Sequence, residues 1–376
     1  MFALLSTAGA VCCRTSSALR SGARGQEIGG DWTEPRGREA RWGRAVGWHW
    51  GGVCSDVLSV VVRTHGGRLI MEVRASCLWV ADHANYVAIN AKAIEHVAEH
   101  MQGAVPSVEW DFEKIHFYDG GPLTAQYMLV LDAMNFCFWP DDELHYEHLA
   151  RGLRNALVAD PKAFDADRLQ SYTGPMLRKL LNWPRELPLE EERARLLREV
   201  GSVLAKNFAG SAANLVARAK KSAVDLVELV AGNFPGFRDH TVYKGQQVFI
   251  YKRAQIFVAD LWGAFKGQGI GEFKDISSIT MFADYVVPAV LRAWGILEYS
   301  PCLAEKVDSQ ENIAPGSEEE VEIRACTITA VELLREALSN RTGEEVTSVQ
   351  VDWWLWSSGI QSIKATDYHH ALTVYY

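Results

Sequence analysis

The sequence EEERARLLREVGSVLAKNF, residues 190–208, carries the clearest structural signal in the chain. Its apolar residues recur every three or four positions, which places them on one face of an α-helix. This stripe consists of Leu196, Leu197, Val200, Val203, Leu204 and Phe208. An apolar face of this kind has to pack against another element, so we expect a helix that is buried along one side.

The same helical spacing appears further along the chain. Residues 224–234 repeat it and stop at Pro235-Gly236, and residues 248–265 are largely apolar. Residues 321–338 form another amphipathic segment, preceded by an acidic run that suits a helix N-terminus. Helices therefore dominate the predicted structure.

Strand signals are sparse by comparison. Residues 127–131 (YMLVL) and 347–356 are the best candidates, and either could be a buried helix instead. Residues 309–317 (SQENIAPGS) have the composition of an exposed loop. We therefore expect a mainly α fold, a single helical domain with few short strands.

The first 70 residues differ in composition from the rest. They contain nine Arg, no Lys and five acidic residues, so they carry a net charge of +4 and the remainder carries −13. We expect a domain over residues 72–376, with Met71 as a candidate internal start and residues 1–70 as a disordered extension. Residues 1–26 contain three Arg and no acidic residue, which also suits a mitochondrial transit peptide; without one, the protein is expected in the cytoplasm.

Composition narrows the class of protein. The chain has 376 residues, of which 48% are hydrophobic and 23% charged, the balance of a globular protein. A net charge of −9 argues against duplex nucleic acid as a partner, and no apolar run is long enough to span a membrane. Seven cysteines without a CxxC pair argue against a zinc site or a disulfide framework. We expect neither a metal nor a cofactor.

The densest cluster of polar and aromatic residues is FKDISSITMFADY, residues 273–285. Val286-Val287-Pro288 follows, and Pro is favoured in the first turn of a helix. Asp284 then lies near a helix start, where it is either a capping residue or a catalytic carboxylate. Lys252, in YKRAQ, either extends to solvent or holds an anion.

Two aromatic clusters complete the set of candidates. NFCFWP, residues 135–140, either builds core or offers faces on which a planar base stacks. In VDWWLW, residues 351–356, Asp352 either caps an element or accepts N–H groups from the edge of a base.

At these clusters the chain resembles the queuosine salvage family of queuosine 5′-phosphate N-glycosylases. The matching runs are NFCFWPDDELHYEHLARGL from Asn135, VYKGQQVFIYKRAQIFVADLW from Val242, FKDISSITMFADYVVPAVL from Phe273 and VDWWLW from Val351. The resemblance covers about residues 73–376. It implies a fold like that of the helical DNA glycosylases, and hydrolysis of the N-glycosidic bond of queuosine 5′-monophosphate. The products would be queuine, for reinsertion into tRNA, and ribose 5-phosphate.

The resemblance also implies residue roles. Asp284 corresponds to the catalytic carboxylate and Lys252 to its supporting cation. Substrate contacts are implied for Phe282, which would stack on the base, and for His116, Asp352, Asp275, Trp139 and Trp356. One departure is Ser357, because family members often have Asp at that position.

The chemistry is consistent with these residues. Breaking an N-glycoside builds positive charge on the sugar, which a fixed carboxylate stabilises. The 5′-phosphate needs one or two cations, for which Lys252, Arg253 and Lys274 are candidates. Two alternatives remain at this point, a base-binding protein without turnover, favoured by Ser357, and a DNA glycosylase, disfavoured by the acidic charge.

Overall fold

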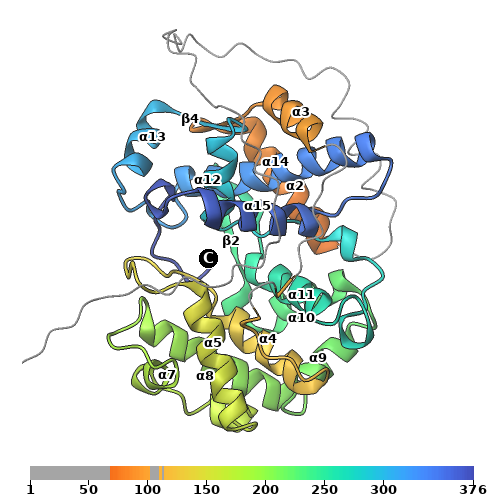
Figure 1. The fold of residues 1–376 in the computed structure, drawn as a ribbon, viewed down its shortest axis with the longest axis vertical. Helices are drawn as coiled ribbons and strands as arrows, with labels where there is room; N and C mark the ends of the chain where they lie inside the picture. The colour runs from red at the N-terminus through yellow and green to blue at the C-terminus, as the bar shows by residue number, and fades with distance from the viewer. Residues whose placement is uncertain (1–67, 102–109, 112–113) are drawn as a thin grey trace, which may run out of the picture. The chain divides into compact units, whose positions relative to one another are not determined.

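The computed structural model describes residues 68–101, 110–111 and 114–376, all within one compact unit, Val57–Tyr376. Helices dominate these residues (Figure 1). Their bounds are α2 Arg68–His83, α3 Ala91–His100, α4 Pro122–Met134, α5 Tyr146–Ala159, α6 Ala166–Leu169, α7 Gly174–Leu180, α8 Glu190–Asn207, α9 Ala212–Arg218, α10 Ala223–Asn233, α11 Lys252–Ala264, α12 Val286–Ala293, α13 Pro301–Asp308, α14 Glu318–Thr342 and α15 Ser348–Ser362. The mainly α prediction is confirmed.

The strands of the described residues form two small antiparallel pairs. Strand β1 (Val87–Ile89) pairs with β4 (Leu297–Tyr299), and β2 (His240–Tyr243) pairs with β3 (Gln246–Phe249). Lys244 and Gly245 join β2 to β3 with φ of 46° and 81°. Positive φ at both positions is what a two-residue hairpin with a type I′ turn requires.

Helix α8 confirms the prediction from residues 190–208. Leu196, Leu197, Val200 and Leu204 are at most 1% exposed, while the opposite face carries Arg195 and other polar residues. The predicted helices at 224–234 and 321–338 are confirmed as α10 and α14, and residues 309–317 are mostly exposed loop.

Both strand predictions are wrong, and the buried-helix alternative holds in each case. Residues 127–131 lie in α4, which is buried over its whole circumference from Thr124 to Met134 and so shows no helical period in its sequence. Residues 347–356 begin α15, where Thr347 and Gln350 form a capping box. The predicted helix at 248–265 is correct only from Lys252 onwards, because Val248 and Phe249 belong to β3.

The N-terminal predictions fall largely outside the described residues, which begin at residue 68. The extension over 1–70 and the transit peptide over 1–26 therefore stay predictions. Helix α2 starts at Arg68, so the first element of the described residues begins before Met71, and its Ile70 is 1% exposed. None of the described helices has the length and apolar character needed to cross a membrane.

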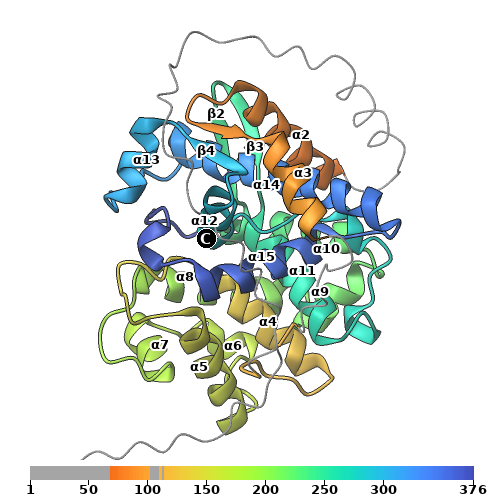
Figure 2. The same cartoon turned by 45° about the horizontal axis from the view of Figure 1, so that its top comes forward.

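Helices α11, α12 and α15 converge in the middle of this unit, and the two views agree on the central position of α15 (Figures 1 and 2). Gly359 allows α15 to approach α12 closely, since a Cβ there would lie 2.6 Å from Val286 and 2.8 Å from Val290. This approach brings Asp284, next to the start of α12, close to Asp352 on α15.

Candidate active site

A cavity of about 410 Å³ lies where these helices meet, a size suited to a small-molecule ligand. Helix α4 ends beside it, α5 begins beside it, and α11 and α15 each present one face to it. Its lining residues are Trp110, Asp111, Ile115, His116, Asn135, Phe136, Phe138, His145, Tyr146, Glu147, Lys252, Ile256, Asp260, Phe282, Asp284, Tyr285, Val286, Asp352, Trp353, Trp356, Ser357, Ile360, Ile363, Ala365, Tyr368 and Tyr376.

Asp284 lines this cavity and also caps α12. Its Oδ1 accepts hydrogen bonds from the backbone amides of Val286 and Val287 at 2.9 and 3.0 Å. The capping interpretation is therefore correct and does not compete with a role in the site. Burial raises the pKa of Asp284, and the nearby Lys252 ammonium opposes that rise.

Lys252 is 5% exposed and is the first residue of α11, rather than lying inside a helix as predicted. Its Nζ lies 3.4 Å from the backbone oxygen of Asn135. Burial lowers the pKa of Lys252, and the carboxylates of Asp284 and Asp132 counteract this. Lys252 therefore does not extend to solvent but supplies a buried cation near Asp284.

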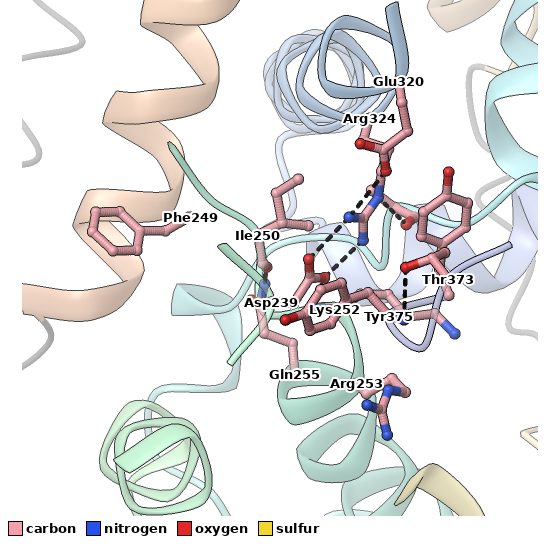
Figure 3. A network of polar contacts seen from close by, with 12 residues as sticks. Asp239, Phe249, Ile250, Lys252, Arg253, Gln255, Glu320, Arg324, Thr373 and Tyr375 are labelled. Atoms are coloured by element: carbon pink, nitrogen blue, oxygen red, sulfur yellow. Dashed lines mark hydrogen bonds and ion pairs between the residues drawn. The ribbon is translucent and has the colours of Figure 1, made fainter. Parts of the chain in front are cut away.

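The backbone of Lys252 is held by a buried ionic network (Figure 3). Oδ2 of Asp239 accepts a hydrogen bond from the Lys252 amide at 3.1 Å, which caps α11 from outside the helix. The Arg324 guanidinium donates hydrogen bonds to both carboxylate oxygens of Asp239 at 2.9 and 2.7 Å. It also lies 3.6 Å from the Glu320 carboxylate. Its guanidinium also lies over the ring of Tyr376, a lining residue, at 4.2 Å. The network fixes the start of α11 and one wall of the cavity together.

Asp352 and Phe282 are linked directly. Oδ1 of Asp352 accepts a hydrogen bond from the Phe282 amide at 3.0 Å, and both residues are nearly inaccessible to solvent. Burial and the neighbouring Asp284 raise the pKa of Asp352 well above its ordinary value. Trp356 also lines the cavity, with its ring edge-to-face against Tyr146 at 6.2 Å.

His116 is anchored from three sides. Its Nδ1 lies 2.8 Å from Oδ1 of Asp111, its Nε2 lies 2.8 Å from the Tyr146 hydroxyl, and Trp110 stacks on its ring at 4.4 Å. This orients the imidazole within the wall of the cavity. Six of the eight predicted site residues are thus brought together: Asp284, Lys252, Phe282, His116, Asp352 and Trp356.

The structure places Asp275 and Trp139 outside the cavity lining. The Asp275 carboxylate accepts bonds from Ser222 and from the amide of Ala223, so it secures the start of α10. Trp139 stacks on His370 at 4.8 Å. The family resemblance implied substrate contacts for both residues, but each meets a structural need elsewhere.

Two of the three candidate phosphate cations are also placed elsewhere. Arg253 is fully buried and donates to the backbone oxygens of Asp132, Ala133 and Gly236. Lys274 is exposed and does not line the cavity. Among the lining residues, Lys252 is the one Lys or Arg.

Sequence reasoning missed several lining residues, of which Asp260 matters most chemically. It lies four residues beyond Ile256 and eight beyond Lys252, so one face of α11 presents all three to the cavity. That spacing was a usable signal, but the apolar residues around Asp260 concealed it. Across the described part of the chain, no group of three or more His, Cys, Asp or Glu residues could hold a metal ion.

Comparison with known proteins decides the family. A family model described as "Queuosine salvage protein" matches residues 115–376. The chain belongs to this family. A queuosine 5′-phosphate N-glycosylase/hydrolase of Dictyostelium discoideum is 44% identical over 319 residues, covering 81% of this chain and 98% of the relative.

Other members of the queuosine salvage family are similarly related. Relatives of the same name from Sphaerobacter thermophilus and Bos taurus are 43% and 34% identical. They cover 79% and 82% of this chain, and 95% and 99% of their own lengths. The family resemblance predicted from the four sequence runs is confirmed.

Proposed function

We propose that the protein hydrolyses the N-glycosidic bond of queuosine 5′-monophosphate and releases queuine and ribose 5-phosphate. The observation that carries the proposal is the position of Asp284, a cavity-lining carboxylate held by α12 and accompanied by the buried cation Lys252. The choice of substrate follows the name of the curated relatives, queuosine 5′-phosphate N-glycosylase/hydrolase.

Asp284 acts on the sugar. As the bond to the base lengthens, positive charge develops on the ribose, and a fixed carboxylate stabilises it or attacks the anomeric carbon. Lys252 favours the ionised form of Asp284, because its ammonium opposes the rise in pKa that burial imposes. The α12 amides hold one carboxylate oxygen, which restricts the side chain to the orientation it needs.

The base leaves from the aromatic side of the cavity. Queuine is a 7-deazaguanine without the basic N7 that acids protonate in purines, so the departing base needs support along its other edges. Phe282 provides a stacking face, and Asp352, tied to the Phe282 amide, contacts the edge of the base. His116 and Trp356 complete this wall.

Incubation of the purified protein with queuosine 5′-monophosphate tests the proposal, with free queuine quantified by mass spectrometry. Catalytic release of queuine is expected. A second candidate is binding without turnover, favoured by Ser357, which lines the cavity at the position where the family resemblance implies Asp. Stoichiometric binding with no queuine formed would replace the proposal with that candidate.

A further inference from the structure

A chain of hydrogen bonds runs along one wall of the cavity through Asp111, His116 and Tyr146. Nδ1 of His116 lies 2.8 Å from Oδ1 of Asp111, and Nε2 of His116 lies 2.8 Å from the Tyr146 hydroxyl. All three residues line the cavity. Trp110 stacks on the imidazole at 4.4 Å, which favours this one orientation of the ring. The chain therefore connects a carboxylate, through an imidazole, to a phenol.

The Asp111 carboxylate is the accepting end of this chain. Its Oδ1 also accepts a hydrogen bond from the Ile115 amide at 2.9 Å. Burial raises the pKa of Asp111, but the hydrogen bonds from His116 and Ile115 outweigh burial and lower the pKa overall. An ionised carboxylate only accepts, so Nδ1 of His116 carries a proton and donates to it. The charge of the imidazole then depends on Nε2, which either accepts from the Tyr146 hydroxyl or donates to it.

Tyr146, the first residue of α5, carries the chain to the wall assigned to the base. Its ring lies edge-to-face against Trp356 of that wall at 6.2 Å. Burial raises the pKa of Tyr146 well above its ordinary value, so the hydroxyl keeps its proton at neutral pH. When Nε2 of His116 donates to the phenol oxygen, the hydroxyl can direct its own proton towards a ligand in the cavity.

Cleavage of the N-glycosidic bond needs a proton donor at the base. The electron pair of the broken bond stays on the base, and queuine leaves as a neutral molecule only when it gains a proton. In the proposed reaction Asp284 acts on the sugar as a carboxylate, so it does not also supply this proton. A donor on the wall that contacts the base meets the need, and the chain ends there with Tyr146.

We propose that Tyr146 protonates the departing base, with His116 replacing its proton and Asp111 supporting the imidazolium. The inference rests on the proposed function. As the bond between C1′ and the base breaks, a ring nitrogen of the base takes the proton of the Tyr146 hydroxyl. The Nε2 proton of His116 passes to the phenol oxygen, which leaves the imidazole neutral. Water adds to C1′, and the proton that it releases restores the cationic imidazole.

Tyr146→Phe keeps the ring against Trp356 and removes only the hydroxyl. Release of queuine from queuosine 5′-monophosphate in a single turnover should slow by about 10²-fold or more, the scale for loss of a general acid. Affinity for queuine, measured by titration calorimetry, should stay within about 3-fold, because a hydrogen bond is lost but no stacking surface. Tyr172→Phe is the matched control, since it removes a buried hydroxyl that bonds to the backbone of Ala163 away from the cavity. It should release queuine as the wild type does.

A solvent isotope effect separates proton transfer from a purely structural role. The wild type should release queuine more slowly in D₂O than in H₂O, and Tyr146→Phe should lose this difference because no proton moves from the residue to the base. Asp111→Asn keeps an oxygen for His116 and removes the charge that supports the imidazolium. It should slow release by about 10-fold, which preserves the test if Tyr146→Phe fails to fold.

Three results would overturn the inference: wild-type release by a folded Tyr146→Phe, an equal isotope effect in both proteins, or a loss of queuine affinity large enough to account for the slower release. Failure of the wild type to form queuine would instead refute the proposed hydrolysis, and the relay with it. Release by the wild type together with an unaffected Tyr146→Phe would refute only the relay.

Discussion

Replacement of Asp284 by Asn separates the two roles that the structure gives this residue. Asn keeps the oxygen that accepts from Val286 and Val287, and Asn and Asp are equally good helix caps. The lost charge–dipole attraction costs about 0.3–1 kcal/mol, and relief of a buried charge beside Asp352 offsets part of it. We therefore expect the free energy of unfolding to change by less than about 1 kcal/mol.

Catalysis should respond far more strongly than stability. Removal of one electrostatic stabiliser typically lowers kcat by about 10²–10³, which corresponds to about 2.7–4 kcal/mol in the transition state. Substrate should still bind, because Phe282 and the other base contacts are unchanged. The assay combines kcat on queuosine 5′-monophosphate, substrate affinity by calorimetry and thermal unfolding of the same preparation.

Asp284→Ala is the matched control, since it removes the cap together with the charge. It should lose about 1 kcal/mol of stability and show the same fall in kcat as the Asn variant. Wild-type kcat in a folded Asp284→Asn protein would refute the catalytic role, and Asp352 would become the next carboxylate to test. Unfolding of the Asn variant would support the capping role, in which Asp284 holds the start of α12 in place.

Three further predictions concern pH, the phosphate and the N-terminus. Burial raises the pKa of the Asp284 carboxyl and Lys252 opposes that rise, so kcat/KM should fall as the pH drops through this pKa. Lys252→Met should move the fall to higher pH. An unshifted pH profile would contradict the pairing of the two residues. If cations bind the phosphate, kcat/KM should be at least about 10-fold higher for the nucleotide than for queuosine, about 1.4 kcal/mol, and equal values would exclude a phosphate site. A chain starting at Met71 should stay active but lose roughly 1.5–3 kcal/mol of stability relative to one starting at Arg68, because Ile70 is buried; equal melting temperatures would show that this packing is unimportant.

Sequence patterns predicted the fold where a helix has one buried and one exposed face. Helix α8 shows its apolar stripe because Arg195 and its neighbours stay in solvent. Helices α4 and α15 have no such contrast, since nearly all their residues are buried or half-buried, and their sequences therefore looked like strands. Periodicity reports differences in environment and cannot detect a helix that is covered on every side.

The candidate site was predictable to a similar degree. Asp284 stood out because capping and polar clustering both mark a helix start. Asp275 lies in the same cluster and was implied by the resemblance, but it caps α10 instead. Asp260 was missed because the apolar residues around it concealed its helical spacing from Lys252. Its importance depends on Trp110 and Asp132, which are distant in sequence and meet it only in the fold.

We propose that this cavity breaks the bond between ribose and queuine. The most direct measurement follows both products, queuine and ribose 5-phosphate, as purified protein consumes queuosine 5′-monophosphate over many turnovers. Our account predicts equal molar amounts of the two products from the wild type and almost none from Asp284→Asn at the same concentration. Substrate that remains intact with the folded wild-type protein, or equal product formation by both proteins, would contradict it.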